Sequence, residues 1–121
     1  MAGTASPDLH HKMELPLEVD NTTIAAGRKS QEDFVLLDCR EADEFELVNI
    51  DDTQFIPMSE LQQRVGELDD HKEQRIVVFC HHGARSLMVA RWRRAQGFTA
   101  QSMIGGIDAW AAEIDPSLPR Y

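Results

Sequence analysis

The sequence predicts an α/β protein in which a parallel β-sheet carries helices on both faces. Two short runs of β-branched, aliphatic and aromatic residues, at 34–38 and 76–79, are typical of strands that are buried on both sides. Segments with helix start and stop signals separate the strands, so that strands and helices alternate along the chain. The length of 121 residues and the 42% share of hydrophobic residues fit one compact globular domain.

Local signals in the first half define the elements expected there. Residues 1–14 are polar and unpatterned, and we expect a flexible lead-in. The next elements are expected to be a strand at 15–19, a helix at 24–29 capped from 20–23, the strand at 34–38, an acidic helix at 41–47 and a strand at 53–56. Ser59 is expected to cap a further helix whose apolar residues recur at helical spacing through Leu68, before a charged loop at 69–74.

In the second half, the strand at 76–79 leads into a loop at 80–85. The elements expected after it are a helix at 86–96 with Gly97 as its C-cap, a strand at 101–104, a Gly105-Gly106 turn, a helix at 107–112 and an extended tail at 116–121. The folded domain is therefore expected to cover 15–115. Because the carboxyl ends of parallel strands meet at one edge of a sheet, the loops at 38–40 and 80–85 are expected to lie together.

The composition argues against some classes of partner. A net charge of -9 and a pI near 4.9 disfavour nucleic acid, because neutralising phosphates needs a basic surface. No apolar run approaches the roughly 20 residues that span a bilayer, so no membrane partner is expected. The first residues show no secretory signal, which favours a cytoplasmic protein. We interpret the dense basic cluster of Arg91, Arg93 and Arg94 as a solvated helix face rather than a docking patch.

The chain has two cysteines, Cys39 and Cys80, and we expect no disulfide between them in a cytosolic protein. Cys80 stands where a buried strand stops, before a short loop with one glycine and a helix start. Backbone N–H groups converge at such a place and the helix dipole favours negative charge, so this thiol is expected to ionise easily. Cys39 is expected to be a small buried hydrophobic residue.

Each residue of the Cys80 loop has an expected part in binding an anion. Gly83 permits close approach of the backbone, and Arg85 adds a permanent cation with a planar fork suited to oxyanions. Ser86 either caps the helix or hydrogen-bonds the sulfur. His81 and His82 can assist binding electrostatically near neutral pH. The candidate site residues are Cys80, His81, His82, Gly83, Ala84, Arg85 and Ser86.

Asp38 and Arg40 are candidate supporting residues at the carboxyl end of the strand at 34–38. Asp38 either orients a neighbouring loop or donor, or serves as a carboxylate that pairs with Arg40 or caps the next helix. A metal site at Cys80-His81-His82 is not expected, because zinc sites usually need four ligands with wider spacing and the sequence shows no second cluster.

A thiolate in such a loop serves two reactions: attack on phosphorus, or acceptance of a sulfane sulfur that is stored as a persulfide. Cys80 and Arg85 have the spacing Cys-x4-Arg, whereas cysteine phosphatases use a loop one residue longer to surround a phosphate. The shorter loop fits a single sulfur more closely. A phosphatase or an arsenate reductase is therefore the less favoured reading.

The chain resembles the single-domain rhodanese-like sulfurtransferases from about Leu17 to Trp110. The segments that carry the resemblance are Leu36-Leu37-Asp38-Cys39-Arg40-Glu41, Glu44-Phe45, Ile56-Pro57, Val77 to Ser86, Gly97-Phe98 and Gly105-Gly106-Ile107-Asp108-Ala109-Trp110. Arg93 departs from the family, which tends to carry an apolar residue there. Its side chain either snorkels to solvent or marks a partner surface.

The resemblance implies a five-stranded parallel sheet and a ping-pong cycle without a cofactor, in which a donor persulfidates Cys80 and a thiophilic acceptor discharges it. The implied partners are a small-molecule sulfur donor such as thiosulfate or a persulfide, and a thiol or cyanide-like acceptor. A sulfur-carrier protein or a cysteine desulfurase is a further possible partner. The alternative from another class is a rhodanese-like binding or regulatory module that docks a partner without turnover.

Overall fold

A computed structural model describes residues 15–71 and 74–121, so the expected lead-in at 1–14 lies outside the described residues. The described chain forms a five-stranded sheet in the order β1-β5-β4-β2-β3, and all its strand pairs are parallel. The strands are β1 (Glu18–Val19), β2 (Phe34–Asp38), β3 (Gln54–Phe55), β4 (Arg75–Phe79) and β5 (Ala100–Met103). The predicted class and the five-stranded parallel sheet are confirmed.

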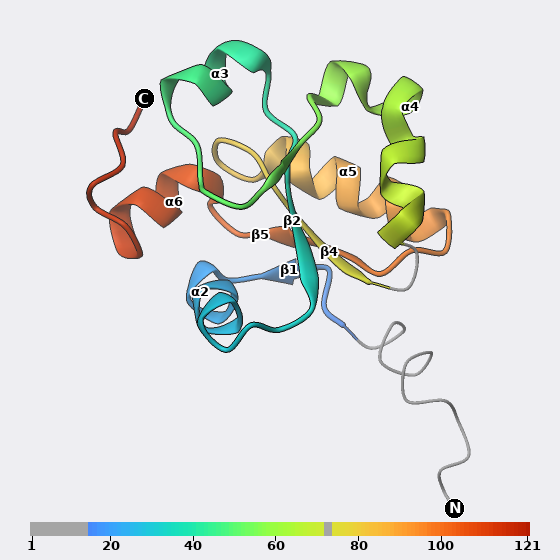
Figure 1. The fold of residues 1–121 in the computed structure, drawn as a ribbon, viewed down its shortest axis with the longest axis horizontal. Coiled ribbons are helices and arrows are strands. Elements are labelled where there is room, and N and C mark those ends of the chain that lie inside the picture. The colour runs from blue at the N-terminus through green and yellow to red at the C-terminus, as the bar shows by residue number, and fades with distance from the viewer. Residues whose placement is uncertain (1–14, 72–73) are drawn as a thin grey trace, which may run out of the picture.

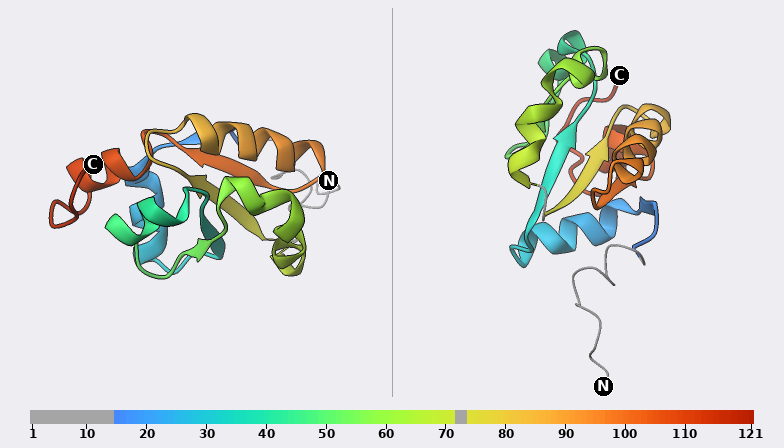
Figure 2. Two further views of the ribbon diagram at one scale, coloured as in Figure 1. Left: turned by 90° about the horizontal axis from the view of Figure 1, so that it is seen from above. Right: turned by 90° about the vertical axis from the view of Figure 1, so that its right-hand side faces the viewer.

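Helices cover both faces of the sheet (Figures 1 and 2). The α-helices are α2 (Asn21–Lys29), α3 (Ala42–Leu47), α4 (Leu61–Arg64), α5 (Ala84–Ala95) and α6 (Gly106–Glu113). Two apolar clusters fill the space between these layers. One holds Ile24 of α2 and Trp110 of α6, and the other holds Leu61 of α4 and Val89 of α5. One face of the sheet is therefore covered by α2 and α6, and the other by α4 and α5.

The side chains of β4 show why these residues form a central strand. Ile76 and Val78 point to the cluster under α4 and α5, and Val77 and Phe79 point to the cluster under α2 and α6. All four are buried, so that both alternating faces of the strand lie in apolar surroundings. Burial of both faces fixes the position of β4 in the sheet. It therefore also fixes the point at which the strand ends, just before Cys80.

The pairing of β2 with β4 decides which loops meet. Asp38 lies opposite Phe79 in the parallel register, and the backbone N–H of Cys39 donates to the Phe79 carbonyl oxygen at 3.1 Å. The two chains leave the sheet side by side at its carboxyl edge. The loops at 38–40 and 80–85 therefore lie together, as we expected.

The helix expected after Ser59 is broken into three short pieces. A 3₁₀ turn, η1 (Met58–Glu60), precedes α4, and a second 3₁₀ segment, η2 (Val65–His71), follows it. Ser59 is not the N-cap, because that position is occupied by Pro57. The Ser59 hydroxyl donates to the Glu41 carboxylate at 2.6 Å instead. The charged loop expected from residue 69 begins later, because η2 continues to His71.

The interpretation of the basic cluster on α5 as a solvated face is wrong for two of its three members. The side chain of Arg93 is 2% exposed, and its guanidinium lies 3.6 Å from the centroid of the Phe98 ring. Arg94 donates to the backbone carbonyl oxygens of Ala100 and Leu15, both at 2.7 Å. Arg94 thus ties α5 to the chain around β5 and β1. Arg93 is buried against Phe98, so its side chain neither snorkels to solvent nor forms part of an exposed partner surface.

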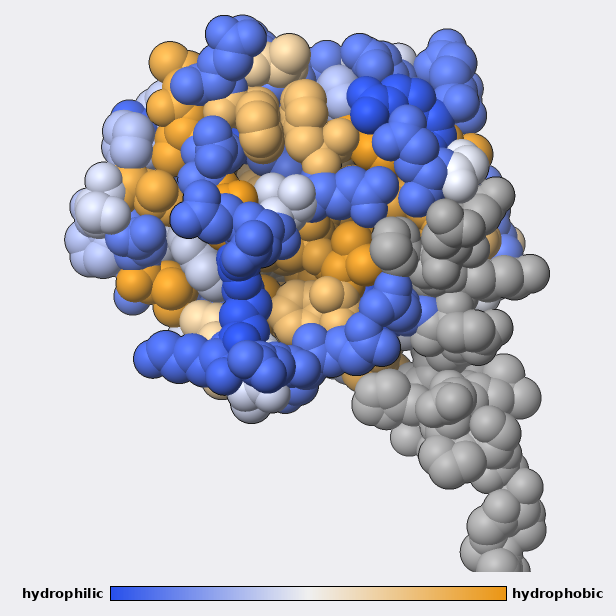
Figure 3. Space-filling view, viewed as in Figure 1, coloured by the Kyte–Doolittle hydropathy of each residue, from blue (hydrophilic) through white to orange (hydrophobic). Residues whose placement is uncertain are grey.

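None of the described helices is both long and apolar enough to cross a membrane. On the face shown in Figure 3, hydrophobic residues lie near the centre and hydrophilic side chains border them.

Candidate functional site

The Cys80 side chain lies at the base of a loop that directs backbone N–H groups toward its sulfur. The N–H of Gly83 donates to Sγ at 3.1 Å and the N–H of Ser86 at 3.4 Å. The thiol in turn contacts the Ser86 hydroxyl at 3.5 Å. Hydrogen bonds from fixed N–H groups are the kind that stabilise an anionic sulfur. Cys80 itself is only 1% exposed.

The helix that follows Cys80 begins two residues earlier than we expected. α5 starts at Ala84, and Gly83 occupies its N-cap with a φ of 120°, a conformation that glycine adopts without a steric penalty. The residues between the strand end and the helix are therefore few, and Ser86 lies in the first turn of α5. Its backbone N–H is free to point at the sulfur because the first N–H groups of a helix have no partner within it.

The Ser86 hydroxyl is part of the support of the loop rather than a helix cap. It donates to the Gly83 carbonyl oxygen at 3.1 Å and shares a 2.7 Å hydrogen bond with the Ser102 hydroxyl of β5. Ser86 and Ser102 are both buried. Of the two roles open from the sequence, contact with the sulfur is the one that the structure shows.

The start of α6 closes the loop from its other side. The N–H of Ile107 donates to the Cys80 carbonyl oxygen at 2.9 Å, and the N–H of Asp108 donates to the His81 carbonyl oxygen at 3.1 Å. Gly106 has a φ of 61°, and a Cβ atom there would overlap both carbonyl oxygens. The Gly-Gly turn is thus needed for a close backbone approach that fixes the Cys80 loop.

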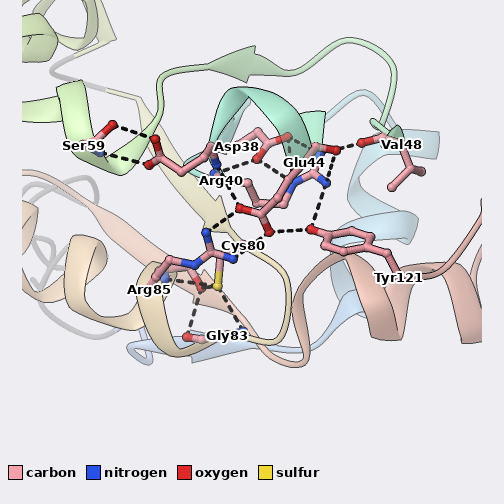
Figure 4. Close-up of polar contacts among 11 residues, drawn as sticks. Asp38, Arg40, Glu44, Val48, Ser59, Cys80, Gly83, Arg85 and Tyr121 are labelled. Atoms are coloured by element: carbon pink, nitrogen blue, oxygen red, sulfur yellow. Dashed lines mark hydrogen bonds and ion pairs between the residues drawn. The ribbon is translucent and has the colours of Figure 1, made fainter. Parts of the chain in front are cut away.

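Asp38 and Arg40 form a buried ion pair beside this loop (Figure 4). Arg40 Nη2 lies 2.7 Å from Asp38 Oδ2, and both side chains are fully buried. The remaining N–H groups of Arg40 are used as well: Nη2 donates to the Val48 carbonyl oxygen and Nη1 to that of Glu44. Of the alternatives for Asp38, pairing with Arg40 is therefore the one that the structure shows, and Arg40 links the end of β2 to carbonyl oxygens within α3 and at its C-cap.

The guanidinium of Arg85 is already paired and is not directed at a ligand above the Cys80 sulfur. Its Nη1 and Nη2 donate to the two carboxylate oxygens of Glu44 at 2.6 and 2.9 Å. Figure 4 shows Arg85 beside Cys80 with its guanidinium turned toward Glu44. Glu44 was expected only as part of a motif, without a role of its own, because nothing in the local pattern connects it with a residue 41 positions away.

Tyr121 is a second residue that the sequence analysis missed. Its hydroxyl donates to Glu44 Oε2 at 2.8 Å and accepts a hydrogen bond from Arg40 Nη1 at 3.1 Å. Its ring stacks on His81 with the centroids 3.8 Å apart. Burial raises the pKa of Tyr121 to about 12, so the phenol stays protonated and can donate to Glu44. No hydrophobic pattern or motif in the sequence predicts this contact.

The two histidines beside Cys80 lie on the rim of the loop. His81 Nε2 lies 2.8 Å from the Tyr121 carbonyl oxygen, and the two imidazole rings are tilted against each other at 3.7 Å. Asp108 joins them: ligand atoms of all three residues lie within 4.8 Å of one another. The Asp108 carboxylate is also held by Arg120 at 2.9 Å. Sequence reasoning did not connect Asp108 with the histidines, because it comes from the start of α6.

Cys39 is buried, as we expected. It belongs to the same apolar cluster as Cys80, and the loss of solvent raises the pKa of its thiol far above the ordinary range. Its backbone carbonyl oxygen accepts a hydrogen bond from Met58. Cys39 therefore serves as packing at the end of β2.

The fold and the loop together define an α/β protein with one thiol held at a helix N-terminus. The Rhodanese-like domain family matches residues 22–113. That match covers well over half of the 121 residues, so the chain belongs to the rhodanese-like family.

Three similar proteins illustrate the range of the family. The thiosulfate sulfurtransferase GlpE of Coxiella burnetii is 36% identical over 81 residues, which are 66% of this chain and 74% of that protein. The adenylyltransferase and sulfurtransferase MOCS3 of Arabidopsis thaliana is 30% identical over 77% of this chain, which spans only 23% of that protein. A rhodanese-related protein of Thermoplasma volcanium superposes with a TM-score of 0.73 at 25% identity, covering 82% of this chain and 94% of that one. The names of the GlpE and MOCS3 relatives support the assignment of this chain as a sulfurtransferase-type domain.

Proposed function

We propose that this protein is a sulfurtransferase that carries a sulfane sulfur on Cys80. The observation behind the proposal is the pair of backbone N–H groups, from Gly83 and Ser86, that point at the Cys80 sulfur at 3.1 and 3.4 Å. These donors suit a thiolate before transfer and a terminal persulfide sulfur after it. The match to the rhodanese-like family and the names of the relatives support the same reaction.

In the first half-reaction the Cys80 thiolate attacks the sulfane sulfur of a donor. A new S–S bond forms to Cys80 while the S–S bond of the donor breaks, and the leaving group departs with the electron pair. No electrons are gained or lost overall, so no oxidant or reductant is needed. Gly83, Ala84 and Ser86 hold the outer sulfur in place through the loop and the first turn of α5.

In the second half-reaction a thiophilic acceptor, such as a thiol or cyanide, attacks the outer sulfur and releases the Cys80 thiolate. The donor is a small molecule such as thiosulfate or a persulfide, and the acceptor is a small thiol or a sulfur-carrier protein. A cysteine desulfurase is an alternative source of the sulfur. His81 and His82 lie on the rim of the loop, where they contact whichever molecule approaches.

A phosphatase reaction is disfavoured by the size of the loop. α5 begins at Ala84, so only three residues separate Cys80 from the helix. That leaves little room for a tetrahedral phosphate between the sulfur and the backbone. Turnover of an aryl phosphate that is lost in Cys80→Ser would revive this alternative.

The proposal is tested by mass spectrometry of the reduced protein after treatment with thiosulfate, an alkyl thiosulfonate and a low-molecular-weight persulfide. We expect at least one donor to add the mass of one sulfur atom to the peptide that contains Cys80. Cyanide should remove the adduct and yield thiocyanate. If none of the three donors adds sulfur to Cys80, the sulfurtransferase proposal fails and the alternative of a non-catalytic binding module is favoured.

A further inference from the structure

Two buried hydroxyl groups face each other between α5 and β5, beside the Cys80 sulfur. Ser86 Oγ and Ser102 Oγ lie 2.7 Å apart, and the two residues are 0% and 1% exposed. Ser102 is paired with Val78 in the β4–β5 register, and Val78 belongs to the apolar cluster under α4 and α5. The serine pair is thus a polar group in an apolar layer, where each hydroxyl needs a hydrogen-bond partner.

The partners of the two hydroxyls determine which of them donates. The Ser86 proton has two other acceptors in reach, the Gly83 carbonyl oxygen at 3.1 Å and the Cys80 sulfur at 3.5 Å. Among the described residues, the Ser102 hydroxyl is hydrogen-bonded to Ser86 Oγ alone. A buried O–H that donates to nothing is costly, whereas a hydroxyl oxygen can accept while its own proton is donated elsewhere. Both hydroxyls are therefore satisfied only if Ser102 donates to Ser86.

This direction leaves the Ser86 proton available to the sulfur. While Cys80 is protonated, its S–H donates to Ser86 Oγ and the Ser86 O–H donates to the Gly83 carbonyl oxygen. When the thiol proton leaves to solvent, the Ser86 O–H can turn to the sulfur while Ser102 continues to donate to Ser86 Oγ. The Gly83 carbonyl oxygen keeps a partner, because the Leu87 N–H donates to it at 3.1 Å.

We propose that Ser102 is a positioning residue for the Cys80 thiolate: its hydroxyl donates to Ser86 Oγ and so directs the Ser86 proton to the sulfur. The anionic sulfur then has a third donor besides the N–H groups of Gly83 and Ser86. The inference deepens the proposed sulfurtransferase function and rests on it, because the same thiolate attacks the sulfur donor. Ser102 acts through Ser86 from another element, 16 positions further along the chain.

Several ionisable groups also surround the Cys80 loop. Arg85 of α5 has an electrostatic interaction with Cys80 and is paired with Glu44 of α3. The other groups lie at the end of β2, on the loop and beside the two histidines: Asp38, Cys39, Arg40, His81, His82, Asp108 and Arg120. A substitution of Ser102 changes none of these charges, so it tests the hydroxyl separately from them.

The first experiment measures how readily Cys80 ionises in Ser102→Ala. The ultraviolet absorbance of the thiolate is followed against pH, and the curve of the same protein with Cys80→Ala is subtracted to isolate Cys80. We expect the midpoint to move upward by about half a pH unit, which is about a threefold lower ratio of thiolate to thiol. This readout needs no reagent to reach the buried sulfur.

The second experiment tests whether Ser102 acts through Ser86. Ser86→Ala removes the hydroxyl that reaches the sulfur but keeps the backbone N–H, and we expect the midpoint to move upward by about one pH unit. In the double variant of Ser86→Ala and Ser102→Ala, the midpoint should equal that of Ser86→Ala. A loss of packing alone would instead add its own effect in both backgrounds.

Thr99→Val is the matched control for losing a buried hydroxyl near β5. Thr99 is 5% exposed, and its hydroxyl has no hydrogen-bond partner in the described part of the chain. The midpoint should stay where it is in the unmodified protein. If Ser102→Ala does not fold, Ser102→Cys takes its place, because a thiol has nearly the same shape but is a weak donor. A smaller shift in the same direction is expected there.

Four results would overturn the role of Ser102: no shift in Ser102→Ala or its substitute, no shift in Ser86→Ala, additive shifts in the double variant, or an equal shift in Thr99→Val. Failure of the proposed function is a separate outcome. Ionisation is measured without any sulfur donor, so the effect of Ser102 on the thiolate can be established even in a protein that accepts no sulfur.

Discussion

The two cysteines occupy corresponding places at the ends of neighbouring strands, but their surroundings differ. Cys39 follows β2 and Cys80 follows β4, and the parallel register places Asp38 opposite Phe79 just before them. Both are almost completely buried, with exposures of 0% and 1%. Burial and position in the sheet therefore do not distinguish them.

The difference lies in where the backbone goes next. After Cys80 the chain curls into a helix start, so that two N–H groups point at the sulfur. After Cys39 the chain continues to Arg40, and the polar groups there serve the ion pair with Asp38. The end of β2 carries a buried ion pair, whereas the end of β4 carries a thiol with N–H donors, which is the arrangement that the proposed function requires.

The largest effect that tests this comparison is on sulfur loading. Cys80→Ala should reduce loading by sulfane donors to background, because no other thiol in the described site has N–H donors of this kind. Cys39→Ala should retain the loading rate to within about twofold. The measurement is the rate of adduct formation by mass spectrometry. Loss of loading in Cys39→Ala with an intact fold would show that the two cysteines act together.

The next effect concerns stability at the end of β2. Asp38→Asn leaves the Arg40 cation buried without its carboxylate, which should lower the free energy of unfolding by about 3–5 kcal/mol. Urea unfolding followed by circular dichroism measures this change. The same substitution at Asp108, whose partner Arg120 is more than half exposed, should have little effect on stability. Similar losses in both variants would contradict the structural role of the Asp38–Arg40 pair.

A smaller loss of stability is expected at the contact that closes the Cys80 loop. Gly106→Ala places a Cβ atom against the carbonyl oxygens of Cys80 and His81 at a positive φ, which should cost about 2–3 kcal/mol. Loading of Cys80 should fall as well, because the loop must shift. Gly66→Ala is the control, since no atom lies within 4 Å of a Cβ atom built there. Normal loading in a folded Gly106→Ala variant would show that the contact does not position the sulfur.

The smallest expected effect is on the pH dependence of stability. The pKa of Glu44 is lowered in the folded protein from 4.5 to about 2, so its contribution is fully present above pH 4.5 and is lost as the pH falls toward 2. Glu44→Gln should remove about 1 kcal/mol of this acid-dependent stability. Unfolding curves measured for both proteins at about pH 6, above this window, and at about pH 3, within it, test this prediction. Parallel losses in the two proteins would contradict the prediction.

Much of the fold is predictable because the central strands are continuous apolar runs. The expected bounds of β2 are those observed, and β4 differs by one residue at its start. The segment after Pro57 was harder to predict, because its apolar residues keep helical spacing while the backbone alternates between 3₁₀ and α geometry. The start of α5 was missed by two residues, since Gly83 can enter the helix at a φ that no other residue adopts easily.

The site was predictable only where its residues are neighbours in the sequence. The Cys80 loop is one continuous segment, so its donors could be inferred from a strand, a glycine and a helix start. Arg85 was expected to bind an oxyanion because of its permanent charge and planar fork. Its pairing with Glu44 could not be predicted, because Glu44 lies on another element, α3. Tyr121 reaches Glu44 from the segment that follows α6. Contacts of this kind depend on how distant segments pack, which no local pattern encodes.

The contact of α6 with the Cys80 loop also bears on how the site forms during synthesis. The N–H groups that hold the Cys80 and His81 carbonyl oxygens belong to Ile107 and Asp108, which leave the ribosome after the whole of β4 and α5. The Cys80 loop is therefore synthesised early but acquires its final geometry late. Under the proposed function, a nascent or partly unfolded chain would carry the thiol without the contacts that position it, and we expect sulfur loading to require the completed fold.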